Sequence, residues 1–278
     1  MKSEFIWSRA LETSRNAIDC GAVIPLETYK YKPVKSIFDY ELRFLKRSFP
    51  KKIIEYGPII NPFIPWDSRL EVQAVNDKYT LILNKYPVQL GHILLITNNW
   101  KPQNGWLSID DFEAISLVDN DTTGLWFFNS SSEAGASQPH RHFQLLRRHT
   151  YESICPRYEW FCSLLNNREF FYSDIKESVS IKPRNNRLDS MAQDLFDSYK
   201  SMIIDMNLGD INNDDKPLKP YNMLITENWI SLIVRSTDRS HGFSINGLGF
   251  AGYFLATKNS EVDMLTKFGP ENILKHVI

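Results

Sequence analysis

Two histidines and a glutamine occupy alternate positions in the segment His140–Leu146, which reads HRHFQLL. On an extended strand side chains alternate between faces, so His140, His142 and Gln144 are expected on one face. Imidazole can attack phosphorus as a neutral nucleophile near pH 7, and a second imidazole beside it can fix which ring nitrogen carries the proton. This segment therefore has the residue types needed to form a covalent nucleotidyl-histidine.

The histidine pair alone fits a nucleophile, a metal site and a purely structural role about equally well, since a His-x-His pair on a strand is also a common way to hold a cation. Such a site needs a third and usually a fourth ligand. The remaining histidines, His92 among them, and the three cysteines show no ligand spacing. The small residues from Ala134 to Ser137 predict free backbone N–H groups, which suit a phosphate better than a cation. No metal ligands are predicted.

The run Gly-Ala-Ser-Gln-Pro-His-x-His-x-Gln, residues 135–144, resembles the signature of the diadenosine tetraphosphate phosphorylases, or ATP adenylyltransferases, of the histidine-triad superfamily. Further segments follow the order of that family: NPFIPW (61–66), LNKY (83–86), FN (128–129), PYNML (220–224), SINGLGFAG (244–252) and FGPENIL (268–274). The resemblance covers nearly the whole chain. It implies an α+β, histidine-triad-like fold with a largely antiparallel sheet and flanking helices, elaborated into one larger catalytic unit.

The resemblance also implies roles for individual residues. His142 is the expected nucleophile, with His140 orienting it from the same face. Gln144 can hold a phosphoryl oxygen, but an amide cannot trade protons, so transfer to phosphate is favoured over activation of water. The implied substrate-binding residues are Lys46, Asn84, Lys85, Asn129, Gly135, Ala136, Ser137, Gln138, Gln144, Asn246, Gly247, Leu248 and Tyr253.

A basic run lies between Lys30 and Lys52, where eight Lys or Arg residues accompany two acids. A solvated face explains such a run about as well as a phosphate site does. The resemblance favours Lys46 within it as a phosphate contact.

The segment Gly247–Gly252 matches the pattern Gly-x-Gly-x-x-Gly, but only 26 residues follow it, too few for the βαβ unit of a dinucleotide fingerprint.

Composition narrows the class of protein. The 278 residues carry a formal net charge of −1, which argues against a general nucleic-acid binder. Residues 1–9 lack an apolar leader, and no window approaches the roughly 18 apolar residues of a membrane span. Three unpaired cysteines favour a reducing compartment. We therefore expect a cytoplasmic enzyme without a membrane or nucleic-acid partner, whose oligomeric state the sequence leaves open.

Periodicity predicts a mixed α/β chain. Residues 8–18 and 188–206 have helical spacing, and Asp110 opens a further helix. Residues 37–44, 79–83, 92–97, 125–129 and 140–146 are β-prone, and residues 222–226 and 229–234 suggest a hairpin. Residues 21–35, 166–187 and 207–219 are expected to be irregular. The predicted division is an N-terminal region, 1–165, with the catalytic strand, and a C-terminal adenylyltransferase region, 188–278, packed as one unit.

The resemblance implies a two-step reaction. His142 attacks the α-phosphorus of diadenosine tetraphosphate and expels ATP, and inorganic phosphate then attacks the adenylyl-histidine to give ADP. A divalent cation such as Mg²⁺ is expected to accompany the polyphosphate. Two alternatives remain open: a transferase acting on nucleotide sugars, which shares His-x-His-x-Gln, and a dinucleoside polyphosphate sensor without catalysis.

Overall fold

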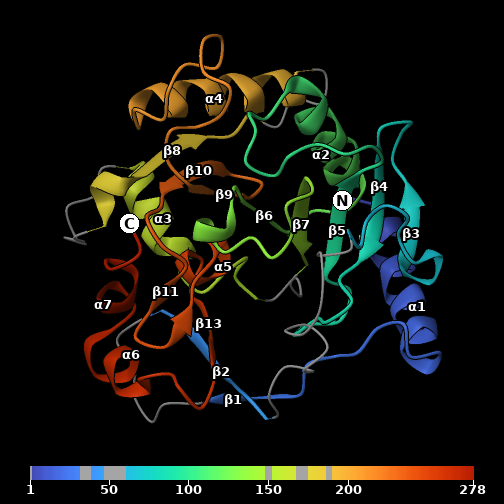
Figure 1. The fold of residues 1–278 in the computed structure, drawn as a ribbon, viewed down its shortest axis with the longest axis horizontal. Helices are drawn as coiled ribbons and strands as arrows, with labels where there is room; N and C mark the ends of the chain where they lie inside the picture. The colour runs from blue at the N-terminus through green and yellow to red at the C-terminus, as the bar shows by residue number, and fades with distance from the viewer. Residues whose placement is uncertain (1, 32–38, 47–60, 148–151, 167–174, 186–189) are drawn as a thin grey trace.

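The computed structural model describes residues 2–31, 39–46, 61–147, 152–166, 175–185 and 190–278 (Figure 1). Its central sheet contains β3 (Glu71–Ala74), β4 (Tyr79–Leu83), β5 (Ile93–Thr97), β6 (Leu125–Asn129), β7 (His142–Leu146), β8 (Val179–Pro183), β9 (Tyr221–Ile225) and β10 (Trp229–Val234). The eight strands are hydrogen-bonded in the order β3-β4-β5-β7-β6-β9-β10-β8. Every neighbouring pair in this sheet is antiparallel, so the predicted α+β class is confirmed.

The central strands are apolar on both faces because each face is covered. On β6, Trp126 and Phe128 belong to one core, whereas Leu125 and Phe127 belong to a second core on the opposite face. This alternation follows from the period of two along a strand. The catalytic strand β7 divides in the same way, because Phe143 faces the first core.

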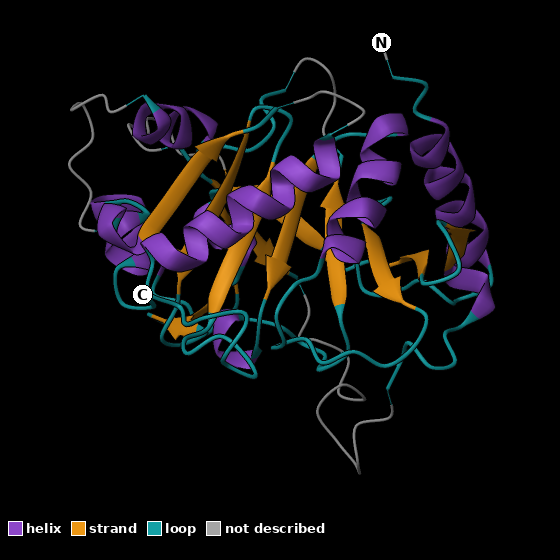
Figure 2. Cartoon of the chain, turned by 90° about the horizontal axis from the view of Figure 1, so that it is seen from above, coloured by secondary structure: helices purple, strands orange, loops and turns teal. Residues whose placement is uncertain are grey.

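Helices cover the first face of the sheet (Figure 2). They are α1 (Phe5–Asp19), α2 (Ile109–Asp121) and α4 (Met191–Asp205). The buried positions of α4 include Met191, Leu195, Tyr199 and Met202, which recur every three or four residues and so form one apolar stripe. The start of α2 is fixed by a capping box between Ser108 and Asp111.

The second face is covered by shorter elements. They are α3 (Tyr158–Leu165), α5 (Gly247–Phe250), α6 (Val262–Phe268), α7 (Glu271–Leu274) and a small sheet of β1 (Thr28–Tyr31), β2 (Glu41–Leu45) and β13 (Tyr253–Ala256). A two-stranded ribbon, β11 (Arg239–Ser240) with β12 (Phe243–Ser244), and the short turns η2 (Ser68–Leu70), η3 (Ser132–Ala134) and η4 (Lys176–Ser178) complete the elements. β2 pairs in parallel with β13, which joins the two ends of the chain.

Most predicted elements are confirmed, including α1, the strands β4 to β7 and the β9–β10 hairpin. Two expectations of irregular chain are wrong, because β1 lies within 21–35 and β8 within 166–187. Both are short, largely exposed or half-buried edge strands, so they lack the apolar run that marks a buried strand. The strand predicted at 37–44 corresponds to β2, and its residues 37 and 38 lie outside the described residues.

Strands from both predicted regions share one sheet, because β6 pairs with β9. The exact division into regions stays a prediction. None of the helices in the described ranges combines the length and the apolar composition that a membrane crossing requires.

Candidate active site

His142 is the first residue of β7, and its side chain is buried. Its Nδ1 lies 2.8 Å from the carbonyl oxygen of His140. Because a carbonyl oxygen only accepts, Nδ1 carries the proton, and the neutral ring keeps a lone pair on Nε2. Burial lowers the pKa of His142 to about 4, so the ring is neutral at pH 7. The imidazole is thus held in its nucleophilic form.

The ring of His140 forms its hydrogen bonds with residues outside β7. Its Nε2 donates to the carbonyl oxygen of Thr97 at 2.9 Å, and its Nδ1 accepts from Nδ2 of Asn61 at 2.9 Å. The expectation that the His140 imidazole sets the tautomer of His142 is therefore wrong, since the backbone carbonyl of His140 does so. His140 precedes β7 and forms an isolated bridge with Pro102. Its ring bonds to Thr97, the last residue of the neighbouring strand β5.

Aromatic rings shield the two histidines from water. The Phe63 ring centroid lies 5.5 Å from that of His140 and 5.4 Å from that of His142. Trp100 packs edge-on against His140 with centroids 5.4 Å apart. Burial also lowers the pKa of His140. This apolar cover is what keeps both imidazoles uncharged near neutral pH.

Gln103 supports the catalytic strand at its first residue. Its Oε1 accepts from the backbone N–H of His142 at 2.8 Å, and its Nε2 donates to the carbonyl oxygens of Asn129 (2.7 Å) and His142 (3.2 Å). The side chain is buried and bridges β6 and β7 where their pairing ends. Gln103 was not predicted from the sequence, because a single glutamine 39 residues away gives no local signal.

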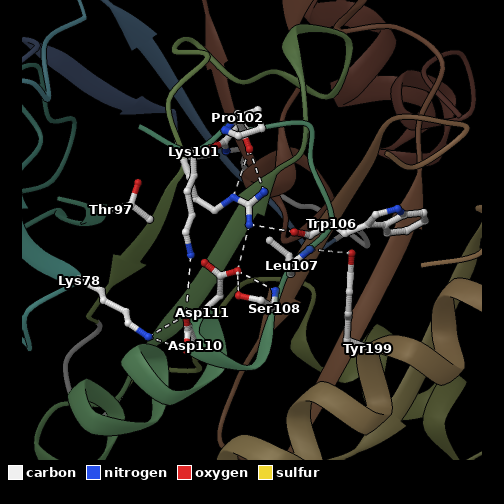
Figure 3. Close-up of polar contacts among 12 residues, drawn as sticks. Lys78, Thr97, Lys101, Pro102, Trp106, Leu107, Ser108, Asp110, Asp111 and Tyr199 are labelled. Atoms are coloured by element: carbon white, nitrogen blue, oxygen red, sulfur yellow. Dashed lines mark hydrogen bonds and ion pairs between the residues drawn. The ribbon is translucent and has the colours of Figure 1, made fainter. Parts of the chain in front are cut away.

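Arg141, which lies between the two histidines in the sequence, anchors this segment through its buried guanidinium. Figure 3 shows its partners Pro102, Trp106 and Asp111. Its guanidinium donates to the carbonyl oxygens of Pro102 at 2.8 Å and Trp106 at 2.9 Å, and pairs with Asp111 at 3.0 Å. Asp111 also accepts from the hydroxyl of Tyr79 at 2.7 Å. The segment that carries Gln103 is therefore fixed to β7 and to the start of α2.

Gln144 shares its face of β7 with His142, because these residues are opposite Leu94 and Ile96 of β5. His92 lies beside Gln144 on this side of the sheet and is buried. Burial lowers the pKa of His92 to about 4, although the amide of Gln144 acts in the opposite direction. His92 is a site neighbour that spacing could not reveal, because only the pairing of β5 with β7 brings it there.

Asn84 belongs to the same corner. Its Nδ2 lies 3.2 Å from Nδ1 of His92, and its Oδ1 accepts from the backbone N–H of Tyr86 at 3.0 Å. Lys85, the next residue, is exposed, and its ammonium lies 6.0 Å from the Tyr86 ring centroid. Asn84 thus shapes the turn after β4, and among the described residues the ammonium of Lys85 has no hydrogen-bond or ion-pair partner.

Asn129 connects the two halves of the site. Its Oδ1 accepts from Nδ2 of Asn222 and from the backbone N–H of Gly247, both at 2.9 Å. Asn222, which was not predicted, also donates to the carbonyl oxygen of Ala134 at 2.8 Å. Within the described ranges, Nδ2 of Asn129 is buried without a partner, so its two donors are available to a ligand.

Gly135 lies directly against Asn246. The glycine has φ +87°, and an added Cβ would come 2.6 Å from the Cβ of Asn246. Only glycine fits both the backbone conformation and this close approach. Asn246 in turn accepts from the backbone N–H of Leu248 at 2.9 Å, at the start of α5. The predicted residues Gly135, Asn246, Gly247 and Leu248 are therefore brought together with Asn129.

The predicted phosphate-binding loop needs a correction. The backbone N–H groups of Ala134, Gly135 and Ala136 donate to the carbonyl oxygens of Ser131 and Ser132 in the turn η3, so they are not free. Ser137 and Gln138 follow this turn, and no acceptor for their N–H groups is found among the described residues. The Oε1 of Gln138 is also buried without a partner there. Of the predicted residues 135–138, Ser137 and Gln138 therefore have N–H groups available to a ligand, whereas those of Gly135 and Ala136 are used in the turn.

The remaining candidates lie around the small sheet. Lys46 is exposed next to residues outside the described ranges, and Tyr253 is the half-buried first residue of β13. Two cations of the basic run are already paired, because Lys30 and Arg43 bond to Glu41 at 2.8 and 2.7 Å. These two cations are therefore engaged with Glu41. A phosphate contact by the rest of the basic run stays a prediction.

The fold and this geometry define a class of protein: an α+β protein that presents a neutral, buried histidine at the start of a central strand. Two family models agree, since the Ap4A phosphorylase N-terminal domain matches residues 1–155 and the ATP adenylyltransferase C-terminal domain matches residues 153–278. The chain belongs to the Ap4A phosphorylase family, Ap4A being diadenosine tetraphosphate.

Two proteins of Saccharomyces cerevisiae are similar in sequence. Protein APA1 is 28% identical over 207 residues, which are 68% of this chain and 64% of that protein, so the chain matches less than two thirds of its length. Diadenosine 5',5'''-P1,P4-tetraphosphate phosphorylase 2 is 27% identical over 233 residues, 74% of this chain and 72% of that protein.

Two solved structures share the fold. The crystal structure of yeast Ap4A phosphorylase Apa2 with AMP has a TM-score of 0.74 at 23% identity, covering 100% of this chain and 97% of that one. The complex of Apa2 with Ap4A has a TM-score of 0.71 at 22% identity, covering 99% and 97%.

Proposed function

We propose that this chain is a nucleotidyltransferase that phosphorolyses Ap4A to ATP and ADP through an adenylyl-histidine at His142. The observation that carries the proposal is the hydrogen bond from Nδ1 of His142 to the carbonyl oxygen of His140, which leaves Nε2 unprotonated. Family membership and the Apa2 complexes with AMP and Ap4A support the choice of substrate.

The first step forms a bond between Nε2 of His142 and the α-phosphorus of Ap4A. The bond from that phosphorus to its bridging oxygen breaks, and ATP leaves with the electron pair. The ring then carries a positive charge while Nδ1 keeps its proton, so the carbonyl oxygen of His140 stabilises the intermediate. In the second step an oxygen of inorganic phosphate attacks the same phosphorus, the P–N bond breaks, and ADP leaves the neutral histidine.

The proposed site residues form two groups, one at the reacting phosphates and the adenylyl group, the other at the distal phosphates and the second adenosine. Asn129, Ser137 and Gln138 offer unused donors for the reacting phosphates. Gln144 holds the adenylyl group without activating water. Lys85 and the segment 246–253 receive the distal phosphates and the second adenosine, with Lys46 as a further phosphate contact.

A divalent cation is part of the proposal. The described residues hold no group of three or more His, Cys, Asp or Glu side chains placed to bind a metal ion. Phosphate oxygens and water are therefore the expected ligands of Mg²⁺, which would neutralise part of the polyphosphate charge. The three cysteines, all among the described residues, form no disulfide, which suits the reducing conditions of a cytoplasmic protein.

Product analysis tests this function. Ap4A is incubated with the protein, with and without inorganic phosphate, and the nucleotides are separated. Equal amounts of ATP and ADP, formed only with phosphate, are expected. Products formed without phosphate, either AMP with ATP or two ADP, would indicate hydrolysis instead. Turnover of a nucleotide sugar but not of Ap4A would favour the related transferase, and binding without any adenylylated protein would favour a sensor.

A further inference from the structure

Arg235 differs from the other deeply buried arginines of the described chain. The side chains of Arg141, Arg157 and Arg184 are at most 3% exposed, and each pairs with a carboxylate. Arg235 is also 2% exposed, but within the described ranges its hydrogen bonds go only to carbonyl and amide oxygens. Burial lowers the pKa of Arg235 to about 10, so the side chain remains charged at pH 7.

The guanidinium of Arg235 links the two walls of the proposed nucleotide site, which are loop 131–138 and segment 244–248. One nitrogen, Nη1, donates to the carbonyl oxygen of Ala134 at 3.3 Å. The other, Nη2, donates to the carbonyl oxygen of Ile245 at 2.9 Å. These carbonyls belong to the residues directly before Gly135 and Asn246, and Gly135 and Asn246 are in close contact. The planar fork thus spans the junction where loop 131–138 meets segment 244–248.

Two further contacts extend this link. Nη1 of Arg235 also bonds to Oδ1 of Asn222, whose own amide donates to Oδ1 of Asn129. Nε donates to the carbonyl oxygen of Val277 at 2.9 Å, near the end of the chain. A single guanidinium therefore fixes the orientation of the Asn129 amide, whose Nδ2 is the unpartnered donor of the site, and ties the last residues to it.

A buried cation without a bonded carboxylate is costly, because its lost hydration is not repaid by an opposite charge. Asp238 acts on Arg235 only through space, and it is itself paired with Arg239 on the surface. The guanidinium is bonded to the carbonyl oxygens of Ala134 and Ile245, which belong to the two segments that line the proposed phosphate site. An anionic ligand bound there would supply the missing counter-charge across a low-dielectric layer.

We propose that Arg235 is a positioning residue that holds the two walls of the nucleotide site together and supplies the positive charge that the phosphates of the ligand complete. This inference rests on the proposed function, because it assumes that phosphates bind between loop 131–138 and segment 244–248. It predicts that Arg235 contributes to the affinity for phosphorylated ligands and not to the affinity for an uncharged nucleoside.

Calorimetric titration of AMP and adenosine measures this difference, since adenosine lacks the phosphate. In Arg235→Met, the preference for AMP over adenosine is expected to fall by about 10-fold or more, the size of one strong charge interaction. Arg235→Lys keeps the charge but not the fork, so the preference should stay within about threefold of wild type while the KM for Ap4A rises. Arg184→Lys is the matched control, a buried arginine paired with Asp119 elsewhere, and should leave both quantities unchanged.

A wild-type preference in Arg235→Met would overturn the inference. So would a 10-fold or greater loss of preference in Arg235→Lys, which serves as the decisive variant if Arg235→Met does not fold. Wild-type protein that binds AMP no better than adenosine would instead reject the phosphate site of the proposed function, so the two failures are distinguishable.

Discussion

The Nδ1–H of His142 donates to the backbone carbonyl oxygen of His140 at a distance of 2.8 Å. Both groups belong to the same short stretch of chain, so the orientation of the nucleophile depends on the backbone of the strand and not on a neighbouring side chain. Substitutions that keep the backbone in place should therefore be tolerated better at position 140 than at position 142.

Replacing His142 with alanine should lower the turnover of Ap4A by several orders of magnitude, because the group that bonds to phosphorus is lost. AMP binding, measured by calorimetry, should survive. His140→Gln should retain more activity than His142→Ala, since it keeps the carbonyl that holds the ring. If His142→Ala kept more than about a tenth of the wild-type rate, the histidine could not be the nucleophile.

Under the proposed function, the amide of Gln144 favours transfer to phosphate over transfer to water. Substituting histidine for Gln144 places a titrating group beside the adenylyl-histidine, where it can deprotonate water. Gln144→His should therefore release AMP from Ap4A in the absence of phosphate, whereas the wild type should not. Chromatographic separation of the products measures this leak. A product ratio identical to that of wild type would show that the amide does not set the acceptor.

The sequence predicts the catalytic strand because its signal is local. Alternation along residues 140–146 indicates which side chains share a face, and the structure agrees for His142 and Gln144. The partners of the His140 ring, Thr97 and Asn61, could not be predicted in this way, because the regular strand begins only at His142. An alternation rule holds within a strand and cannot describe the residue that precedes it.

The rest of the site depends on contacts between distant segments. Gln103, His92 and Asn222 reach the site through sheet pairing or a crossing loop, and no periodic pattern encodes that register. Likewise, the glycine and small residues of 134–136 suggest free N–H groups. Their N–H groups are consumed by the turn η3, which only the three-dimensional chain path reveals.

Gln103 should matter for both stability and rate. Gln103→Leu removes the amide oxygen that accepts from the N–H of His142 and the amide nitrogen that donates to the carbonyl oxygens of Asn129 and His142. Unsatisfied buried groups cost about 1–3 kcal/mol, so the free energy of unfolding in urea should fall by that order. The kcat should fall as well, because β7 loses its support next to the nucleophile. Unchanged stability and kcat would show that another group takes over these bonds.

Acid should destabilise the protein in a defined range of pH. Burial lowers the pKa of both His92 and His142 to about 4, below the ordinary value near 6.5. In this window the unfolded chain binds more protons than the native one, so stability falls as the pH drops from about 6.5 toward 4. Urea midpoints measured across this range should decrease, and His142→Gln should flatten the slope. A midpoint independent of pH would show that neither histidine is held neutral.

Lys78 precedes β4 and Lys85 follows it, so these two exposed lysines form a matched pair at opposite ends of the strand. Lys85 follows Asn84 at the corner that includes His92 and Gln144, whereas Lys78 pairs with Asp110 at the other end of the strand. One charged hydrogen bond is worth about 1.5–3 kcal/mol, or roughly 10- to 100-fold in affinity.

Lys85→Ala should therefore weaken Ap4A by about that factor and AMP much less, because AMP leaves the distal phosphate positions empty. Lys78→Ala should change neither affinity. Calorimetric titration of both ligands separates the possibilities. Equal weakening of AMP and Ap4A by Lys85→Ala would place the lysine at the adenylyl position, and no weakening of either would make it a solvated residue of the turn after β4.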